Sequence, residues 1–405
     1  MIDTELAVRP PVSYAPSSSM VARAADLATQ FQTTAAESDR AGAFPADEFR
    51  MLASEGLLAA PIPEVYGGAG LDGRQVTLRT QLQLLSELGR GNLAAGRVYE
   101  GHVNALMLIA TFGTSAQIDR WASDVVTTDL LFAVWNTEAN DGVRIVPRRD
   151  GRFILEGSKT FCSGAGYVQR PIVPGALPDG GWQMTVVPME RVSTTIDPSW
   201  WQPLGMRGSA SYRIDFTGVI LDPDDLLGAP GDYHRQPWLS AGSIRFAAVQ
   251  LGGAEALLDA TRAMLQGMGR TDDPYQQHRI GEMAIAIESG YHWLLGASEM
   301  VDLSPGAGNR SQHDIDRTLS YAHMTRLAIE RICLDVMERA ERSAGARAML
   351  APHPIERIIR DLTLYLRQPA PDAALETVGR FALDHSERTG ELWQQRGSGR
   401  ADKTS

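Results

Sequence analysis

The feature that most constrains the fold of this sequence is the spacing of its apolar residues, which changes character twice along the chain. In residues 20–128 and again in residues 241–395, apolar side chains recur every three to four positions, which is typical of helices. Between them, residues 129–240 break into short runs rich in β-branched and aromatic residues, separated by glycine and proline. One run, residues 212–216, alternates apolar and polar residues as a half-buried strand does. The chain is therefore predicted to be mainly α with a central β domain (α+β): an N-terminal helical domain, a middle β-barrel and a C-terminal four-helix bundle.

The C-terminal helical region contains the longest predicted helix. Residues 314–342 keep helical spacing throughout, over roughly 40 Å at 1.5 Å per residue. Pro354 and Pro371 fall where proline is tolerated, in the first turn of a helix. Long helices joined by short loops favour an antiparallel bundle. The two ends, residues 1–19 and 396–405, are predicted to be a disordered arm and a disordered tail.

The charge and the cysteine content narrow the class of protein. The chain of 405 residues has a formal net charge of −11 and no basic block, which argues against a nucleic-acid partner. No apolar stretch approaches the roughly 18 residues of a membrane-spanning helix, and the N-terminal arm lacks the apolar core of a signal peptide. The two cysteines, Cys162 and Cys333, are too far apart for a CxxC metal site. We therefore expect a cytoplasmic protein with neither a nucleic-acid nor a membrane partner.

One glycine-rich string has the spacing of a dinucleotide-binding loop. Residues 68–73 match GxGxxG, but that loop needs a preceding strand and an acidic residue about 20 positions later. A helix and a proline-rich loop precede the string, and Leu93 stands at the acidic position, so a Rossmann fold is excluded. The eight histidines show no HxH or HExxH spacing, and no serine-centred nucleophile elbow occurs. Neither a metal site nor a hydrolase is predicted.

A series of short strings follows in one order along the chain. The N-terminal strings are residues 55–58, 61–64, 66–68 and 112–117, the middle strings are 135–138, 157–164, 204–209, 215–219 and 227–228, and the last is the Arg360-Asp361 pair. In residues and in order, these strings resemble those of the acyl-CoA dehydrogenase family over about residues 20–390. The resemblance implies the same succession of helical, β and helical parts as the apolar spacing does.

The resemblance also implies an FAD-dependent oxidoreductase that oxidises an acyl-CoA or a related CH–CH substrate and forms a homodimer or homotetramer. The flavin would lie between the β domain and the C-terminal bundle. Thr137 would bond to its pyrimidine end, Ser163 would lie near its N5 and O4 atoms, and Phe161 would flank the ring. A flavin needs such hydrogen-bonding groups and apolar walls. Carried over by position, the cofactor-binding residues are Trp135, Thr137, Phe161, Ser163 and Gly345, and the substrate-binding residue is Arg245.

The catalytic glutamate of that family is missing. The family places it nine residues beyond the Arg of the Arg-Asp pair, where this chain has Pro369, or just before the Arg that opens the bundle, where it has Ile244. Prolines 369 and 371 also exclude a continuous helix, since an interior proline costs about 3 kcal/mol. Asp372 could reach the same space from a rigid turn and is the candidate base. Its alternative is an ordinary acidic residue at the start of a helix.

Other departures leave a second function open. Residues 139–142 replace the string that contacts acyl-CoA, and no Arg-x-x-Phe-Gly string for the FAD pyrophosphate is recognisable near residues 262–270. These departures resemble a sister branch on the same fold, the monooxygenases that use reduced flavin and O₂, for which FMN is a possible cofactor. Several of those enzymes place a histidine or serine near the flavin. His102 is the candidate here, and its alternative is a helix-face histidine that only packs.

Three functions therefore stay open. The main prediction is the dehydrogenase, with a small-molecule substrate that is possibly a CoA thioester. The second is a reduced-flavin monooxygenase or N-oxidase, which needs no base for an α proton. The third is a non-catalytic member that keeps the fold as a binding module.

Overall fold

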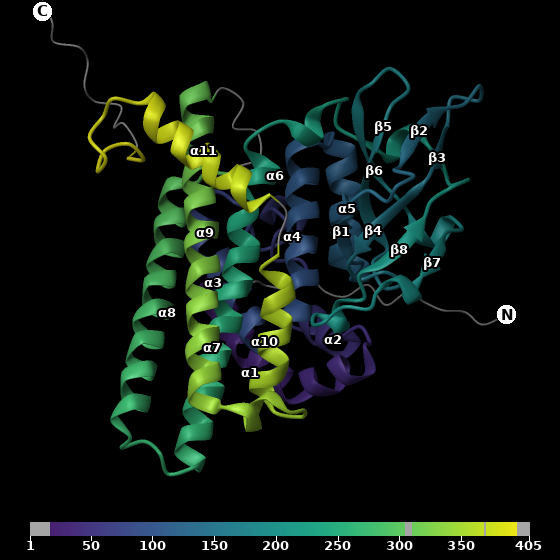
Figure 1. Cartoon of the computed structure of the whole chain (residues 1–405). Helices are drawn as coiled ribbons and strands as arrows, with labels where there is room; N and C mark the ends of the chain where they lie inside the picture. Colours follow the sequence, from purple (N-terminus) through teal and green to yellow (C-terminus); the bar gives the residue numbers. More distant parts are fainter. Residues whose placement is uncertain (1–16, 304–309, 368–369, 395–405) are drawn as a thin grey trace, which may run out of the picture.

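The computed structural model describes residues 17–303, 310–367 and 370–394 (Figure 1). The predicted arm lies outside these ranges up to residue 16, and the predicted tail lies wholly outside them. Within them the predicted mainly α architecture with a central β part is confirmed. None of their helices is long and apolar enough to cross a membrane.

Helix α4 is the central helix of the N-terminal part. It is buried along nearly its whole length because apolar residues occupy almost every face, and it packs against strand β1. Asn92 begins the helix, since its side chain accepts a hydrogen bond from the Ala94 N–H at 3.0 Å. The helices of this part are α1 (Ser17–Ala41), α2 (Ala46–Ser54), α3 (Gln75–Gly91), α4 (Leu93–Phe112) and α5 (Ser115–Thr128).

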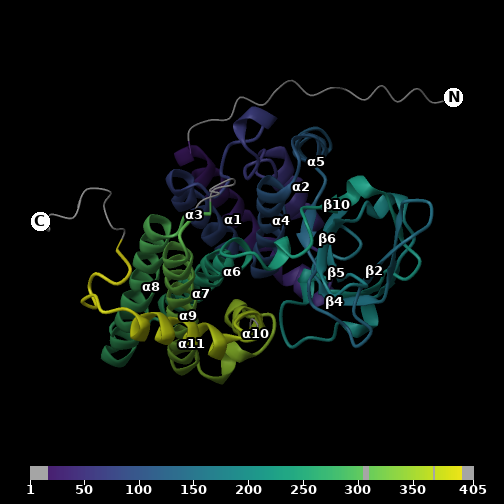
Figure 2. The ribbon, with the colours of Figure 1, turned by 90° about the horizontal axis from the view of Figure 1, so that it is seen from above.

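Helix α7 is the central helix of the C-terminal part and packs against α3, α8, α9 and α10. The long helix predicted for residues 314–342 is confirmed as α9, and the predicted proline break falls between α10 and α11. Helix α11 crosses the end of the bundle beside α9 (Figures 1 and 2). The helices are α6 (Trp238–Ala241), α7 (Ser243–Gly267), α8 (Pro274–Met300), α9 (Gln312–Ala344), α10 (Pro354–Tyr365) and α11 (Pro371–Asp384).

The contact between α3 and α7 depends on glycine. A Cβ atom at Gly252 would overlap the carbonyl oxygen of Ser86, and one at Gly89 would overlap the carbonyl oxygen of Val249. The two backbones therefore approach more closely than any side chain allows. This approach joins the N-terminal helices to the C-terminal bundle.

The β part contains two sheets, which do not close into the predicted β-barrel. The larger sheet has the order β10-β6-β5-β2-β3-β9, with β1 parallel to β5, and the smaller has the order β4-β8-β7. The chain leaves the larger sheet for the smaller at Gly157, whose φ of +100° turns it between β3 and β4. The strands are β1 (Phe132–Val134), β2 (Arg144–Pro147), β3 (Phe153–Glu156), β4 (Ser158–Cys162), β5 (Arg170–Ala176), β6 (Trp182–Val186), β7 (Thr195–Asp197), β8 (Tyr212–Asp215), β9 (Ile220–Leu221) and β10 (Leu226–Leu227).

The Arg-Asp pair found in the sequence ties the bundle to the β part. Asp361 of α10 accepts a hydrogen bond from the backbone N–H of Met206. Arg360 donates to the carbonyl oxygen of Leu204 at 3.2 Å and pairs with Asp39 of α1 at 2.7 Å. Figure 2 shows the β part on one side, the bundle on the other, and α4 and α6 between them.

Candidate functional site

A cavity of about 720 Å³ lies where the β part, α4 and the C-terminal helices meet. Its volume falls within the range of about 300–1,000 Å³ that is typical of cofactor and small-molecule sites. Helix α4 contributes Arg97, Glu100, Gly101 and Asn104; the β part contributes Val134, Asn136, Thr137, Phe161, Ser163, Trp201, Met206, Ser209, Ser211 and Tyr233; the C-terminal region contributes Leu239, Ser240, Gly242, Ser243, Phe246, His323, Arg326, Leu364, Tyr365, Arg367, Ala370, Ala373, Ala374 and Thr377.

Strand β4 holds the backbone segment that presents Asn136 and Thr137 to this cavity. The Thr160 N–H donates to the carbonyl oxygen of Thr137 at 2.9 Å. The Lys159 side chain is fully buried; it donates to the carbonyl oxygen of Asn136 at 3.1 Å and pairs with Glu138. Burial lowers the pKa of Lys159, and the nearby Glu138 carboxylate opposes that shift. The two predicted flavin segments, residues 135–138 and 157–164, thus form one wall.

Three buried serines continue that wall. The hydroxyl oxygens of Ser163 and Ser211 are 2.8 Å apart, and those of Ser211 and Ser209 are 2.7 Å apart. The three hydroxyls therefore form a hydrogen-bonded chain that begins at Ser163, the predicted flavin residue. All three serines line the cavity. Trp135, also predicted to contact the flavin, lies behind this wall and donates its Nε1–H to the carbonyl oxygen of Ser163 at 2.9 Å.

Phe161 is held in the cavity wall by an unusual backbone. Its φ is +53°, and the β4–β8 pairing shifts register between Lys159 and Cys162. The ring is 47% exposed and packs edge-on against Trp201, with 5.9 Å between the ring centroids. Met206 and Ala370, which also line the cavity, have φ values of +57°. Positive φ in non-glycine residues is costly and clusters at functional sites.

The α4 wall carries a buried polar chain. Arg97 donates to Oε2 of Glu100 at 2.7 Å, and the Asn104 amide donates to Oε1; Glu100 is 3% exposed. Behind Asn104, Arg245 donates from Nη1 to the Asn104 Oδ1 and from Nε to Gln81, both at 2.8 Å. Burial lowers the pKa of Arg245 to about 10, and Glu100 opposes that shift, so the guanidinium stays charged at neutral pH.

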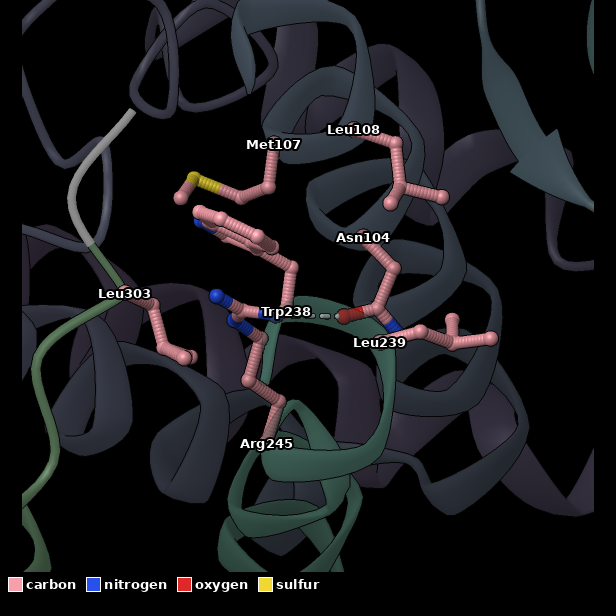
Figure 3. A pocket seen from close by; sticks show the side chains of 7 residues that line it. All are labelled: Asn104, Met107, Leu108, Trp238, Leu239, Arg245 and Leu303. Atoms are coloured by element: carbon pink, nitrogen blue, oxygen red, sulfur yellow. Dashed lines mark hydrogen bonds between the residues drawn. The ribbon is translucent and has the colours of Figure 1, made fainter. Parts of the chain in front are cut away.

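Arg245 does not line the large cavity. It borders a separate space of about 10 Å³, enough for one water molecule, together with Met107 and Trp238 (Figure 3). Asn104 borders both spaces, and the hydrogen bond from Arg245 to Asn104 is drawn in Figure 3. The predicted substrate residue therefore reaches the cavity only through Asn104.

The bundle wall combines cations with hydroxyl groups. Arg326 lies over the ring of Phe246, with 5.3 Å from its guanidinium carbon to the ring centroid. Burial, and then the charge of Arg326, lower the pKa of His323 to about 4, so its imidazole is neutral at pH 7. Burial raises the pKa of Tyr365 well above its ordinary value, and Glu100 adds to that rise.

His102, the predicted catalytic histidine, lies in the core and does not line the cavity. It is 0% exposed, and its Nε2 is 2.8 Å from the carbonyl oxygen of Leu58. Its Nδ1 accepts the Phe132 N–H at 3.1 Å. Burial lowers the pKa of His102 to about 4, against the opposing effect of the Leu58 hydrogen bond. Both ring nitrogens are engaged with backbone, so we interpret His102 as a packing residue that joins α4 to β1.

Two further predicted residues lie apart from the cavity wall. Asp372 is exposed on the first turn of α11, whereas its neighbours Ala370 and Ala373 line the cavity. Gly345 follows the last residue of α9 with a φ of +63°, and a Cβ added there would meet nothing within 4 Å. Of the two family positions for the base, Ile244 is fully buried among apolar side chains, and Pro369 lies outside the described residues. The structure thus brings together Thr137, Phe161 and Ser163 of the predicted site.

Several cavity residues carry signals that the sequence analysis missed. Arg97, Glu100 and Asn104 recur at intervals of three and four in a helix whose other residues are mostly apolar, and such a polar stripe on a buried helix indicates a site. Ser209 and Ser211 are two polar residues directly before the alternating run of residues 212–216. Ser243 and Tyr365 carry no such signal, because they line the same cavity only through the packing of α7 and α10.

The sequence matches two models of one protein family. Residues 18–129 match "Acyl-CoA dehydrogenase, N-terminal domain", and residues 244–366 match "Acyl-CoA dehydrogenase, C-terminal domain". A dibenzothiophene monooxygenase of Rhodococcus erythropolis is 29% identical over 66% of this chain and 70% of its own length. A probable FMNH2-dependent monooxygenase of Pseudomonas putida is 25% identical over 92% of this chain and 97% of its own length.

The fold also has a close counterpart among solved structures. TdsC from Paenibacillus sp. A11-2, crystallised with FMN and indole, superposes with a TM-score of 0.82 at 22% identity, over 93% of this chain and 100% of that one. The two family models cover more than half of this chain, in the order that the sequence strings had indicated. The chain belongs to the acyl-CoA dehydrogenase superfamily of flavin-dependent oxidoreductases.

Proposed function

We propose that this chain is a monooxygenase that uses reduced FMN and O₂ to oxygenate a small molecule. The observation that carries this proposal is Glu100, the one carboxylate among the cavity-lining residues that the structure describes. Its two oxygens accept hydrogen bonds from Arg97 and Asn104. Both carboxylate oxygens are thus already engaged as acceptors within the α4 wall, whereas a dehydrogenase needs a base that can reach the α proton. The monooxygenase alternative is therefore better supported than the dehydrogenase that was the main prediction.

The relatives support the same choice. The matched Rhodococcus and Pseudomonas proteins bear the names of monooxygenases, and the second is named for reduced FMN. The matched Paenibacillus structure holds FMN together with indole, a small aromatic molecule. A small aromatic or sulfur-containing molecule is accordingly a better first substrate to test than a CoA thioester.

The residues of the cavity fit FMN. Thr137 and Ser163 offer hydroxyls to the polar edge of a flavin, and Phe161 and Trp201 offer an apolar face. Arg326 and Arg367 line the same cavity and supply positive charge for a phosphate. Gly345, the residue expected near the adenosine half of FAD, is not among the lining residues, which favours FMN over FAD. When bound, reduced FMN supplies the two electrons with which one atom of O₂ enters the substrate and the other becomes water.

The chain's own groups have separable tasks in this proposal. The Ser163–Ser211–Ser209 hydroxyl chain holds a proton at Ser163 Oγ and can replace it from the next hydroxyl. The aromatic rings of Phe161 and Trp201 exclude water from the flavin side. The Arg97–Glu100–Asn104 group fixes the α4 wall without leaving a free base.

The test supplies reduced FMN to the full chain from NADH and a separate flavin reductase. We expect O₂ uptake that depends on substrate, and one ¹⁸O atom from ¹⁸O₂ in the product, with indole and dibenzothiophene as the first substrates. Thr137→Val should weaken FMN binding, whereas Thr377→Val, in which the lost hydroxyl already donates to the Ala373 carbonyl oxygen at 2.9 Å, should not.

Two outcomes would contradict the proposal. Anaerobic bleaching of the bound flavin by acyl-CoA thioesters, without any O₂-dependent product, would favour the predicted dehydrogenase function. Failure to retain FMN even after reconstitution would favour the non-catalytic binding module. The predicted homodimer or homotetramer and the predicted cytoplasmic location stay predictions, which size-exclusion chromatography with light scattering and cell fractionation would check.

A further inference from the structure

We propose that the cavity contains a second polar subsite, formed by the hydroxyls of Ser243 and Tyr365, that binds an acceptor oxygen of the substrate. The inference rests on the proposed function, because it assigns a substrate class to the same cavity. The class is a small molecule with a carbonyl, carboxylate or sulfinyl oxygen. A bare hydrocarbon ring of equal size would lack the group that this subsite binds.

The first observation is that two buried hydroxyls lack partners. Ser243 is 6% exposed and Tyr365 is 3% exposed, and both line the cavity. Neither Ser243 Oγ nor Tyr365 Oη has a hydrogen-bond partner among the described residues. A buried hydroxyl without a partner loses its hydration and gains nothing in return. A ligand that accepts hydrogen bonds from both groups would recover that loss.

The second observation is that the positions of both hydroxyls are fixed by the fold. Ser243 is the first residue of α7, and Tyr365 is the last residue of α10. The Gln250 side chain of α7 donates to the carbonyl oxygen of Tyr365 at 2.9 Å, which joins α7 to the end of α10. The N-terminus of the long helix α7 adds a partial positive charge, which favours an acceptor oxygen.

The third observation concerns the charges near the subsite. Glu100 is the one carboxylate among the described lining residues, and it already forms an ion pair with Arg97 at 2.7 Å. The other lining side chains with a full charge, Arg326 and Arg367, are cations. A substrate ammonium group would therefore meet no unbalanced negative charge, whereas an acceptor oxygen would meet two hydroxyl donors.

The test measures binding without turnover, by isothermal titration calorimetry of the full chain loaded with oxidised FMN. The ligands share one ring: acetophenone has a neutral oxygen, benzoate has an anionic one, and cumene has none. We expect Ser243→Ala and Tyr365→Phe each to weaken acetophenone about 3- to 10-fold and benzoate about 10- to 100-fold. Binding of cumene should change less than about 2-fold, since its contacts are apolar.

Thr377→Val is the matched control, because it removes a hydroxyl that lines the same cavity but already donates within α11. It should leave the binding of all three ligands unchanged. The visible spectrum of bound FMN and the thermal melting temperature check that each variant is folded and loaded.

Equal weakening of acetophenone and cumene would overturn the proposal, because it would indicate packing rather than hydrogen bonding. Unchanged binding of every ligand in both variants would also overturn it, as would preference of the wild-type chain for benzylamine over acetophenone. The calorimetry uses oxidised FMN and no reductant, so the expected binding pattern can be found even if the chain does not oxygenate any substrate. Conversely, oxygenation can hold when the binding pattern fails, so the two proposals are distinguishable.

Discussion

Ser163 is the residue at which a sequence string, a cavity position and a hydrogen-bonded chain coincide. Its hydroxyl lies 2.8 Å from that of Ser211, which in turn lies 2.7 Å from that of Ser209. The sequence predicted Ser163 because it belongs to the string of residues 157–164, whose members are neighbours in the chain. Ser211, which directly precedes β8, is 48 residues away in the sequence, and only the tertiary fold brings its hydroxyl close to that of Ser163. Ser211 is thus a positioning residue for Ser163.

We expect Ser211→Ala to lower oxygenated product about 10-fold, roughly the free energy of one hydrogen bond. The flux should shift to hydrogen peroxide, because Ser163 loses the hydroxyl that orients it. The ratio of product to peroxide per NADH consumed is the measurement, and Ser211→Thr should restore it. A merely structural role would instead lower FMN affinity and melting temperature while leaving that ratio unchanged.

His102 gives a prediction about acid stability. Its pKa is about 4 in the folded chain against 6.5 for the free group, because burial opposes its charging. A depressed folded pKa means that its stabilising contribution is present above pH 6.5 and is lost as the pH falls towards 4. We expect the free energy of unfolding to drop by about 2 kcal/mol from this group between pH 7 and pH 5. Chemical denaturation of wild type and His102→Gln at both pH values measures it, and an equal drop in both would contradict it.

At the scale of elements, the helices followed from the sequence better than the strands. The α9 helix spans Gln312–Ala344, and the prediction was residues 314–342. The agreement is close because helical periodicity is a local property of the sequence. The barrel prediction was wrong because strand pairing, unlike helical periodicity, is not local. Strand pairings such as β3 with β9 join residues more than 60 positions apart, and no local pattern specifies whether short strands close into one sheet or divide into two.

The α3–α7 contact gives a prediction at the same scale. Gly252→Ala places a methyl group against the Ser86 carbonyl oxygen, so the helices must separate. We expect it to lower the free energy of unfolding by about 1–3 kcal/mol or more. Gly281→Ala on the exposed face of α8, where a Cβ meets nothing within 4 Å, is the control and should raise stability by about 0.5–1 kcal/mol. Thermal melting of the pair checks this, and similar melting temperatures would count against the close approach.

At the scale of the whole molecule, the cavity exists only where three parts meet. The predicted residues Thr137, Phe161 and Ser163 all come from the β part, whereas Glu100 lies on α4 and Tyr365 on α10. The sequence could indicate the first wall because its residues lie in two short strings. The α4 wall carries a sequence signal only in its polar stripe, and the bundle wall carries none, since its residues converge only through packing of helices that are distant in the chain.

Asp361 joins two of these parts and gives a prediction of opposite sign to that for His102. Burial raises its pKa from 3.8 to about 6, although Arg357, at 3.6 Å, opposes that shift. The folded chain therefore binds this proton more tightly, and the contribution of Asp361 to stability falls as the pH rises from about 4 to about 6. Its magnitude is on the order of 3 kcal/mol.

Asp361→Asn should remove that pH dependence while lowering stability at pH 7, because Arg357 loses its buried partner. Denaturation curves at pH 4.5 and pH 6.5 for wild type and variant give the difference in slope. The prediction is wrong if both proteins respond to pH alike. The domain contact at Met206 would then be insensitive to the protonation of its acceptor.

The left-handed backbone of the cavity wall has a consequence for anyone who engineers this enzyme. Phe161, Met206 and Ala370 each occupy a conformation that costs an ordinary residue roughly 1–2 kcal/mol. Glycine or asparagine at these positions would relieve that cost. Selection for heat resistance alone would therefore favour substitutions that remove the phenyl ring of Phe161 and the thioether of Met206 from the wall. A library that screens for turnover at every round would keep them.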